Sequence, residues 1–131
     1  MTATDFNEKI EIFSVDESGK ITFLPISFAR DSFGTEVYRV DDARIDVAPD
    51  GSFAIIATAK GSASRGPYIQ RVYRADADGS NLREIARFDS GRVAGMVDIA
   101  VGSDNSVFVL TMQGEIPNVG GSDSIYKIDK D

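Results

Sequence analysis

The sequence repeats itself at a spacing of just over 50 residues, and this repeat limits the possible folds more than any other feature. Asp50-Gly51-Ser52 returns 54 positions later as Asp104-Asn105-Ser106. Tyr73-Arg74-Ala75-Asp76 returns 53 positions later as Tyr126-Lys127-Ile128-Asp129. A period of this length indicates a supersecondary unit that buries its apolar faces against further units of the same kind.

A third, incomplete unit precedes these two. Phe13 and Gly19 lie 60 positions before their equivalents, Tyr73 and Gly79. This longer spacing means that extra residues separate the first unit from the second. We expect the extra residues within the range 25–42, where the pattern is least regular.

Short runs of β-branched and aromatic residues fill most of the chain, and Gly, Asp, Asn or Pro bound them. Such runs predict β-strands joined by turns. One stretch, residues 81–88, has a pattern that one or two helical turns would also satisfy, but its length and the glycines on both sides favour a strand. The expected strands occupy residues 10–15, 20–24, 53–58, 69–74, 82–88, 97–101, 107–111 and 124–128.

The turn residues carry the second local signal. Gly51 exchanges with Asn105 between the two units, and both residue types tolerate the positive φ that a tight hairpin turn requires. Gly79 is predicted to adopt positive φ as well, because Gly19 stands at the equivalent point. Where a third strand enters its turn, an aspartate is expected to accept hydrogen bonds from backbone N–H groups two residues on; these aspartates are Asp16, Asp76 and Asp129.

Two segments resemble the blade repeat of TolB-like and NHL-like β-propellers: residues 47–53, Val-Ala-Pro-Asp-Gly-Ser-Phe, and residues 72–82, Val-Tyr-Arg-Ala-Asp-Ala-Asp-Gly-Ser-Asn-Leu. The second unit is similar over residues 99–128, and residues 114–121 are similar to a loop of the ScyD/ScyE-type propellers. The resemblance covers residues 43–131 and the hairpin at 8–24. It implies four-stranded antiparallel blades and leaves the function open, because propellers host many unrelated activities.

The repeat and the resemblance together predict an all-β chain, a partial β-propeller of about two to three four-stranded antiparallel blades. Residues 1–131 are expected to form one segment. Its parts are an N-terminal hairpin at 8–24, an irregular insertion at 25–42, a full blade at 43–89 and an incomplete blade at 95–131. Because a propeller contains about four to eight blades, we expect self-association or pairing with a missing part of a parent protein.

Composition excludes several classes of function. The formal net charge of −7 repels phosphate backbones, so nucleic acid is not an expected partner. The chain has no Cys and no His, which removes disulfides, thiolate chemistry, Ser–His catalysis and His-ligated metals. It has no signal-peptide pattern at its start and no apolar run near the roughly 20 residues that a membrane helix needs. We expect a soluble domain that does not contact membranes, and its cellular location stays open.

Four polar residues near the predicted innermost strands are the candidate ligand contacts: Asp42, Arg44, Asp46 and Asp98. Asp41 belongs to the same group. In a propeller such strands line a central channel, and oxygen ligands there would suit calcium. The alternative is that these residues are hydrated polar side chains of the channel wall or rim. No catalytic residue and no cofactor-binding or metal-binding residue is assigned.

Seven basic residues between positions 60 and 92 make this stretch locally positive. They alternate with apolar residues, as expected for the solvated outer face of a strand. The alternatives are a surface that binds anions and a surface that docks a protein.

Two classes of function fit the sequence. Loops 61–67 and 113–123 take the same place in the two units and are long enough to contact a ligand. The first hypothesis is therefore a non-catalytic propeller segment that binds a protein or a carbohydrate through loops at the ends of its blades. The second is a piece of a calcium-dependent propeller enzyme, a hydrolase similar to the lactonase or lyase propellers, whose acidic residues would converge on the channel. Enzymatic activity is left open, and the binding hypothesis is favoured.

Overall fold

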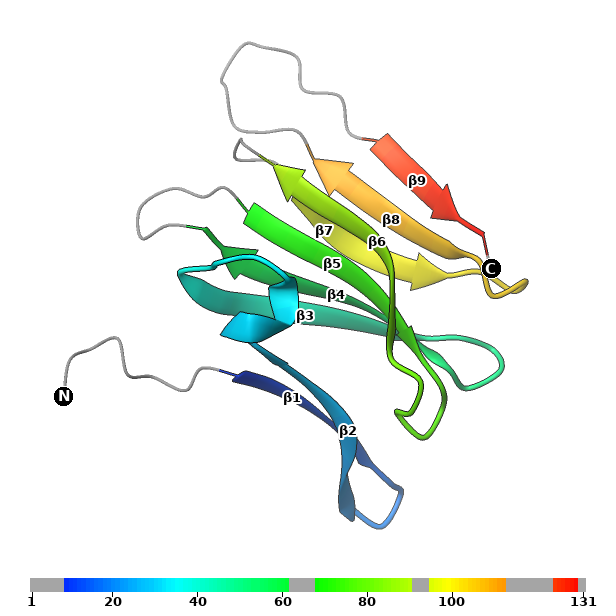
Figure 1. Ribbon diagram of the computed structural model, residues 1–131. Helices are drawn as coiled ribbons and strands as arrows, with labels where there is room; N and C mark the ends of the chain where they lie inside the picture. Colours follow the sequence, from blue (N-terminus) through cyan, green and yellow to red (C-terminus); the bar gives the residue numbers. More distant parts are fainter. Residues whose placement is uncertain (1–8, 62–67, 91–94, 113–123, 130–131) are drawn as a thin grey trace, which may run out of the picture.

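The computed structural model describes residues 9–61, 68–90, 95–112 and 124–129 (Figure 1). Within these residues the chain forms nine β-strands and one short 3-10 helix, η1, and no helix there is long and apolar enough to cross a membrane. The elements are β1 Lys9–Val15, β2 Ile21–Ala29, η1 Arg30–Phe33, β3 Arg39–Val47, β4 Phe53–Lys60, β5 Tyr68–Ala75, β6 Arg83–Ser90, β7 Gly95–Val101, β8 Val107–Met112 and β9 Ser124–Ile128. The predicted all-β structure is confirmed, and residues 83–90 are a strand as favoured.

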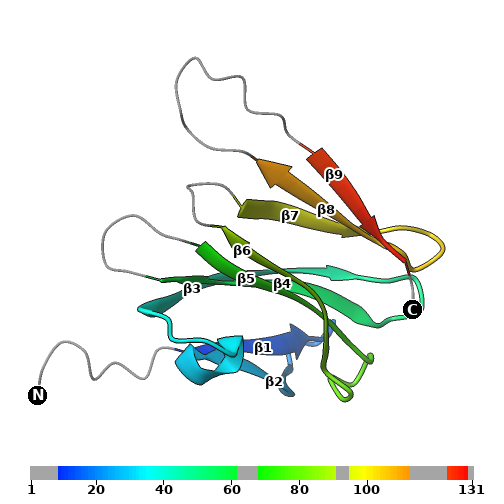
Figure 2. The same ribbon diagram turned by 45° about the horizontal axis from the view of Figure 1, so that its top comes forward.

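The strands pair only with their neighbours in sequence and form three antiparallel sheets. The first sheet has the order β1-β2, the second β3-β4-β5-β6 and the third β7-β8-β9. Figure 2 shows them as three layers, with the four-stranded sheet in the middle. The described strands form open sheets, so both β3 and β7 lie at sheet edges.

The middle sheet is covered on both faces. Because β4 and β5 lie at its centre, they are buried along nearly their whole length, which is typical of a strand enclosed between two layers. One apolar cluster fills the space between the two-stranded sheet and the middle sheet, with Ile26, Phe28, Ile55 and Tyr73 among its members. A second cluster joins the middle sheet to the three-stranded sheet and contains Ala54, Ile56, Val72, Ile99, Val107 and Val109.

The stretch 25–42 is more regular than the sequence predicted. Residues 25–29 continue β2, η1 follows, and residues 39–42 begin β3. Two irregular features remain: residues 30–38, which hold η1 and the connection to β3, and a bulge, where residues 24–26 of β2 stand opposite the single residue Ile12 of β1. A bulge near a sheet edge accommodates Pro25, which cannot donate a backbone hydrogen bond. Phe33 of η1 is buried in the first apolar cluster, so this stretch contributes to the core.

Four tight turns of one kind connect the strands, at residues 16–20, 48–52, 76–80 and 102–106. In each turn the first and fifth residues share a backbone hydrogen bond, and the N–H of the fourth donates to the carbonyl of the first. The fourth residue has positive φ in every case: Gly19 at 86°, Gly51 at 86°, Gly79 at 84° and Asn105 at 64°. The predicted positive φ of Gly79 and the exchange of Gly51 with Asn105 are thus confirmed.

Aspartates cap these turns, although one of them is not the predicted residue. Asp16 accepts from the backbone N–H groups of Ser18 at 2.8 Å and Lys20 at 3.0 Å, as expected. Asp76 was the wrong choice, because Asp78 accepts from the N–H of Ser80 at 2.9 Å while Asp76 accepts from a side-chain amide. Asp50 and Asp104 repeat the arrangement of Asp78 with Ser52 and Ser106.

The caps also affect the carboxyl groups themselves. The pKa of Asp78 is held below its usual range by two hydrogen bonds from Ser80. The bond from the Ser80 hydroxyl has the larger effect, and the bond from its backbone N–H has the smaller one. Hydrogen bonds from Ser106 lower the pKa of Asp104 in the same way. The remaining predicted cap, Asp129, lies 3.9 Å from the Lys127 ammonium, and the residue two positions on lies outside the described residues.

The turn at residues 76–80 is seated against β2, and this contact gives a testable difference between two glycines. Gly79 and Gly19 have nearly the same φ, so alanine at either position should cost about 1 kcal/mol through backbone strain. At Gly79 the added Cβ would also lie 2.7 Å from Cδ of Pro25, whereas at Gly19 it would meet nothing within 4 Å. We expect urea unfolding to show that Gly79→Ala costs at least about 1 kcal/mol more than Gly19→Ala. Equal costs would contradict the packing of this turn on β2.

Candidate functional site

Three of the four candidate ligand contacts share one face of β3. Asp42, Arg44 and Asp46 are alternate residues of this edge strand. Arg44 pairs with Ile56 and Asp46 with Ala54, and both partners point into the apolar cluster beneath the three-stranded sheet. Because directly opposed residues of antiparallel strands share a face, the three polar side chains lie on the side of β3 that is turned toward that sheet.

Asp98 is placed differently. Its neighbour on β7, Ile99, points into the apolar cluster, so Asp98 lies on the opposite, outer face of the three-stranded sheet. Its carboxylate accepts a local hydrogen bond from the N–H of Ile99 at 2.9 Å. Asp41 occupies a register shift of β3 and pairs with Arg39 at 3.3 Å. The predicted group is therefore divided between two sheets.

Asp46 has a structural partner. Its Oδ2 accepts a hydrogen bond of 2.8 Å from the backbone N–H of Val101, which connects β3 to β7 across two sheets. Asp42 and Arg44 are exposed, and neither has an ion-pair or hydrogen-bond partner among the described residues. In that part of the chain no three acidic side chains come close enough to hold a metal ion.

The interpretation of the basic stretch as a solvated face is wrong for two of its arginines. Arg71 is only 1% exposed and Arg74 only 3%. Arg74 reaches from β5 to the turn between β7 and β8, where Nη1 donates to the carbonyl oxygen of Asn105. Because the middle sheet is covered on both sides, side chains that would be outward-facing in a one-sided sheet are enclosed here.

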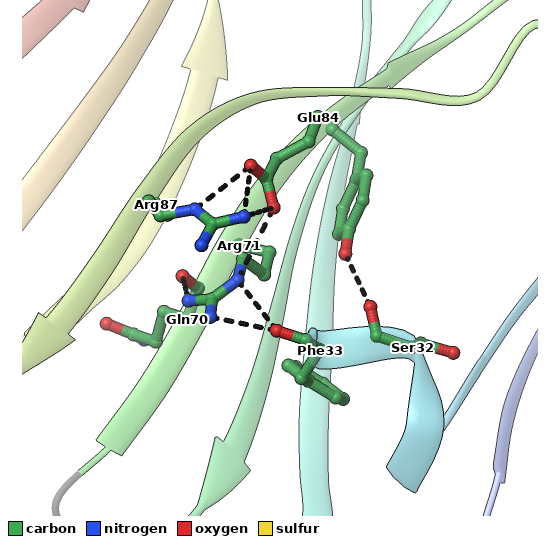
Figure 3. A network of polar contacts seen from close by, with 7 residues as sticks. Ser32, Phe33, Gln70, Arg71, Glu84 and Arg87 are labelled. Atoms are coloured by element: carbon green, nitrogen blue, oxygen red, sulfur yellow. Dashed lines mark hydrogen bonds and ion pairs between the residues drawn. The ribbon is translucent and has the colours of Figure 1, made fainter. Parts of the chain in front are cut away.

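Arg71 lies at the centre of a polar network on the other face of the middle sheet (Figure 3). Nε and Nη2 donate to the carbonyl oxygen of Phe33 at 3.2 and 2.9 Å, and Nη1 donates to that of Gln70 at 2.8 Å. Glu84 of β6 lies 3.4 Å from Nε and holds the exposed Arg87 through both of its carboxylate oxygens. The buried guanidinium therefore has a partner for each nitrogen, as a buried charge requires.

The network fixes η1 on the middle sheet. The hydroxyl of Tyr73 donates to the carbonyl oxygen of Ser32 at 3.3 Å, beside the bonds from Arg71 to Phe33. Burial raises the pKa of the Tyr73 phenol, and the nearby negative charge of Glu84 raises it further. Carbonyl oxygens that would otherwise be unpaired at the end of this short helix are thereby satisfied. We interpret the network as a structural connection.

A different group of residues lies where β3 begins and β4 ends. We call Tyr38, Arg39, Lys60 and Tyr68 the loop-end cluster. Arg39, Lys60 and Tyr68 are opposite one another in a row across three strands. The Lys60 ammonium stands 6.0 Å from the centre of the Tyr68 ring, and the backbone N–H of Tyr38 donates to the Lys60 carbonyl at 2.7 Å. The Tyr38 side chain is 43% exposed.

No motif in the sequence marks the loop-end cluster as a group. The one sequence feature that could have indicated the cluster is that Lys60 and Tyr68 flank the segment 61–67. Arg39 joins them only through the pairing of β3 with β4. Apart from Gly61, the predicted loops 61–67 and 113–123, including residues 114–121, lie outside the described residues. The strands that lead to these loops end at Lys60 and Met112.

No protein-family model, no curated protein and no solved structure matches this chain. The function therefore has to be argued from the arrangement of the side chains. The described residues offer two groups for that argument: the polar residues along β3 and the loop-end cluster.

The two aspartates of β3 differ in their partners, which makes their roles separable. We expect Asp46→Ala to cost about 1–2 kcal/mol, because it leaves the Val101 N–H without its acceptor. Asp42→Ala should change stability by less than about 0.5 kcal/mol, since Asp42 is exposed. Urea unfolding measures both. If Asp42→Ala destabilises the fold as much as Asp46→Ala, the assignment of the connecting role to Asp46 is wrong.

Proposed function

We propose that this chain is a non-catalytic segment of a β-propeller-type protein that binds a protein or a carbohydrate at one end of its sheets. The proposal is supported by the stacking of antiparallel sheets whose strands follow one another in sequence order, as propeller blades do. The observation that carries it is the difference between the two ends of the stack.

One end is closed by the four tight turns. Their backbone groups bond within each turn, and their aspartates accept from serines of the same turn. Polar groups that already have short, local partners offer little to a ligand, because binding would have to replace those bonds. The turn end is therefore the less suitable side for recognition.

The opposite end carries the loop-end cluster, whose chemistry suits a ligand. Two tyrosine rings provide apolar faces with a polar hydroxyl, and Lys60 provides positive charge on a chain with a net charge of −7. Arg39 adds a second cation, although Asp41 already pairs with it at 3.3 Å. Sugars stack on aromatic rings and carry hydroxyls for hydrogen bonds. An acidic saccharide uses all these features, and an acidic protein segment uses the charges and one ring face.

The second candidate is a piece of a calcium-dependent propeller enzyme of the lactonase or lyase type, a hydrolase. Its support is that Asp42 and Asp46 share one face of an edge strand. Against it stands the position of Asp98 on another sheet face. This candidate requires calcium binding, whereas the first requires only the loop-end cluster.

Thermal melting with added ligands distinguishes the candidates. We expect oligogalacturonate at ten times its Kd to stabilise the fold by about 1.4 kcal/mol, and Tyr38→Ala to abolish this shift. Tyr126→Ala is the matched control, because Tyr126 is an exposed tyrosine on β9. The same melts with an acidic peptide test the protein ligand. A shift with millimolar calcium alone that Asp42→Asn removes would overturn the proposal in favour of the enzyme.

A further inference from the structure

The outer face of the two-stranded sheet is apolar and uncovered in the described chain. Phe13, Val15, Ile21 and Phe23 are 51–65% exposed. Strand register sets Phe13 opposite Phe23 and Val15 opposite Ile21, and the two phenylalanine rings are 5.7 Å apart. We call these four residues the hairpin face. Four large apolar side chains in one patch are unusual for a surface exposed only to water.

The three-stranded sheet has a comparable outer face. Val107 and Val109 point into the core, so Phe108 and Leu110 point outward. Leu110 pairs with Ile125 of β9, which is 71% exposed. We call Phe108, Leu110 and Ile125 the sheet face. The two-stranded and three-stranded sheets lie on opposite sides of the four-stranded sheet (Figure 2). The hairpin face and the sheet face are therefore the two outer surfaces of the three layers.

The repeat relates the sheet face to a surface that the chain itself covers. The equivalents of Phe108, Leu110 and Ile125 one unit earlier are Ala54, Ile56 and Val72. Those three residues of the middle sheet are at most 1% exposed, because the three-stranded sheet packs on them. The sheet face is therefore the same kind of surface, without its covering layer.

The hairpin face is related to the other side of the middle sheet. The equivalents of Phe13 and Val15, 60 positions later, are Tyr73 and Ala75. Tyr73 is 8% exposed and Ala75 1%, because the two-stranded sheet covers them, with the Tyr73 ring 5.0 Å from that of Phe28. Each contact between layers joins one face of the hairpin-face kind to one face of the sheet-face kind. The hairpin face and the sheet face are therefore complementary to each other.

We infer that a second copy of this chain covers these surfaces, with the hairpin face of one copy packed on the sheet face of the next. The chain already makes this kind of face-to-face contact twice within itself, and the remaining two faces are one of each kind. A head-to-tail contact uses a different surface on each partner, so it adds copies until the array closes into a ring or continues as a chain. The association does not depend on the ligand proposed for the loop end.

Light scattering after size exclusion tests the inference at tens of micromolar. The wild-type chain is expected at twice the monomer mass or more, rising with concentration. Phe23→Glu blocks the hairpin face and Ile125→Glu blocks the sheet face, so each variant alone should be monomeric. An equimolar mixture should recover a species of twice the monomer mass and none larger, because each variant retains the half that the other lacks.

Leu82→Glu is the matched control, since Leu82 is an exposed apolar residue in the connection between β5 and β6; it should associate like the wild type. Each variant must also melt cooperatively, which shows that it is folded. If a glutamate variant fails to fold, the corresponding serine variant, Phe23→Ser or Ile125→Ser, replaces it. The inference is overturned if the folded wild-type chain is monomeric. It is also overturned if these faces bind a different protein and do not bind a second copy of the chain. A mixture that stays monomeric overturns it as well, as does association that only Phe23→Glu abolishes, since two hairpin faces would then meet each other.

Discussion

The structure depends on the burial of both faces of the four-stranded sheet. Strands β4 and β5 have no polar face to turn toward water, because residues such as Ile55 and Ile56 alternate between two apolar clusters. Burying an aliphatic side chain of this size stabilises a fold by about 1.5–3 kcal/mol. The middle sheet therefore needs a layer on each side. The outer sheets have fewer strands and are stabilised by packing on the middle sheet, because a two-stranded hairpin alone is marginally stable in water.

Apolar faces alone would not fix how the layers sit on one another. Three polar contacts between layers supply that specificity: Arg71 with the carbonyl of Phe33, Arg74 with the carbonyl of Asn105, and Asp46 with the N–H of Val101. Each connects a side chain of the middle sheet to a backbone group of a neighbouring segment. Because an unpaired buried charge is costly, a shift of one layer against another would lose more than apolar contact area.

The strands and turns were predictable because their signals are local. Alternating apolar residues mark strands, and a glycine or asparagine at the fourth turn position marks positive φ, as at Gly79 and Asn105. The choice of Asp78 over Asp76 as a cap was not predictable, since both stand in the same turn and the difference lies in which carboxylate faces Ser80. The strand residues within the stretch 25–42 were not predicted, because the bulge at Pro25 interrupts the alternation of inward-facing and outward-facing residues along β2.

The site residues were harder to predict because they depend on register and stacking. Arg71 and Arg74 alternate with apolar residues as surface arginines do, but η1 covers Arg71 on one face of the middle sheet and the turn between β7 and β8 covers Arg74 on the other. Asp42 and Asp46 are four residues apart on one face of β3, yet β7 supplies a donor to Asp46 alone. Arg39, Lys60 and Tyr68 come from three strands and meet through pairing that sequence does not reveal.

Hydrogen exchange of individual backbone amides, followed by NMR, tests the central claim that the middle sheet is the covered layer. Amides of β4 and β5 that bond within the sheet should exchange most slowly, near the limit set by global unfolding. Amides of β1 and β9 should exchange much faster when the chain is held monomeric by Phe23→Glu, because each has an open edge. Exchange in β4 and β5 as fast as in β9 would contradict the account.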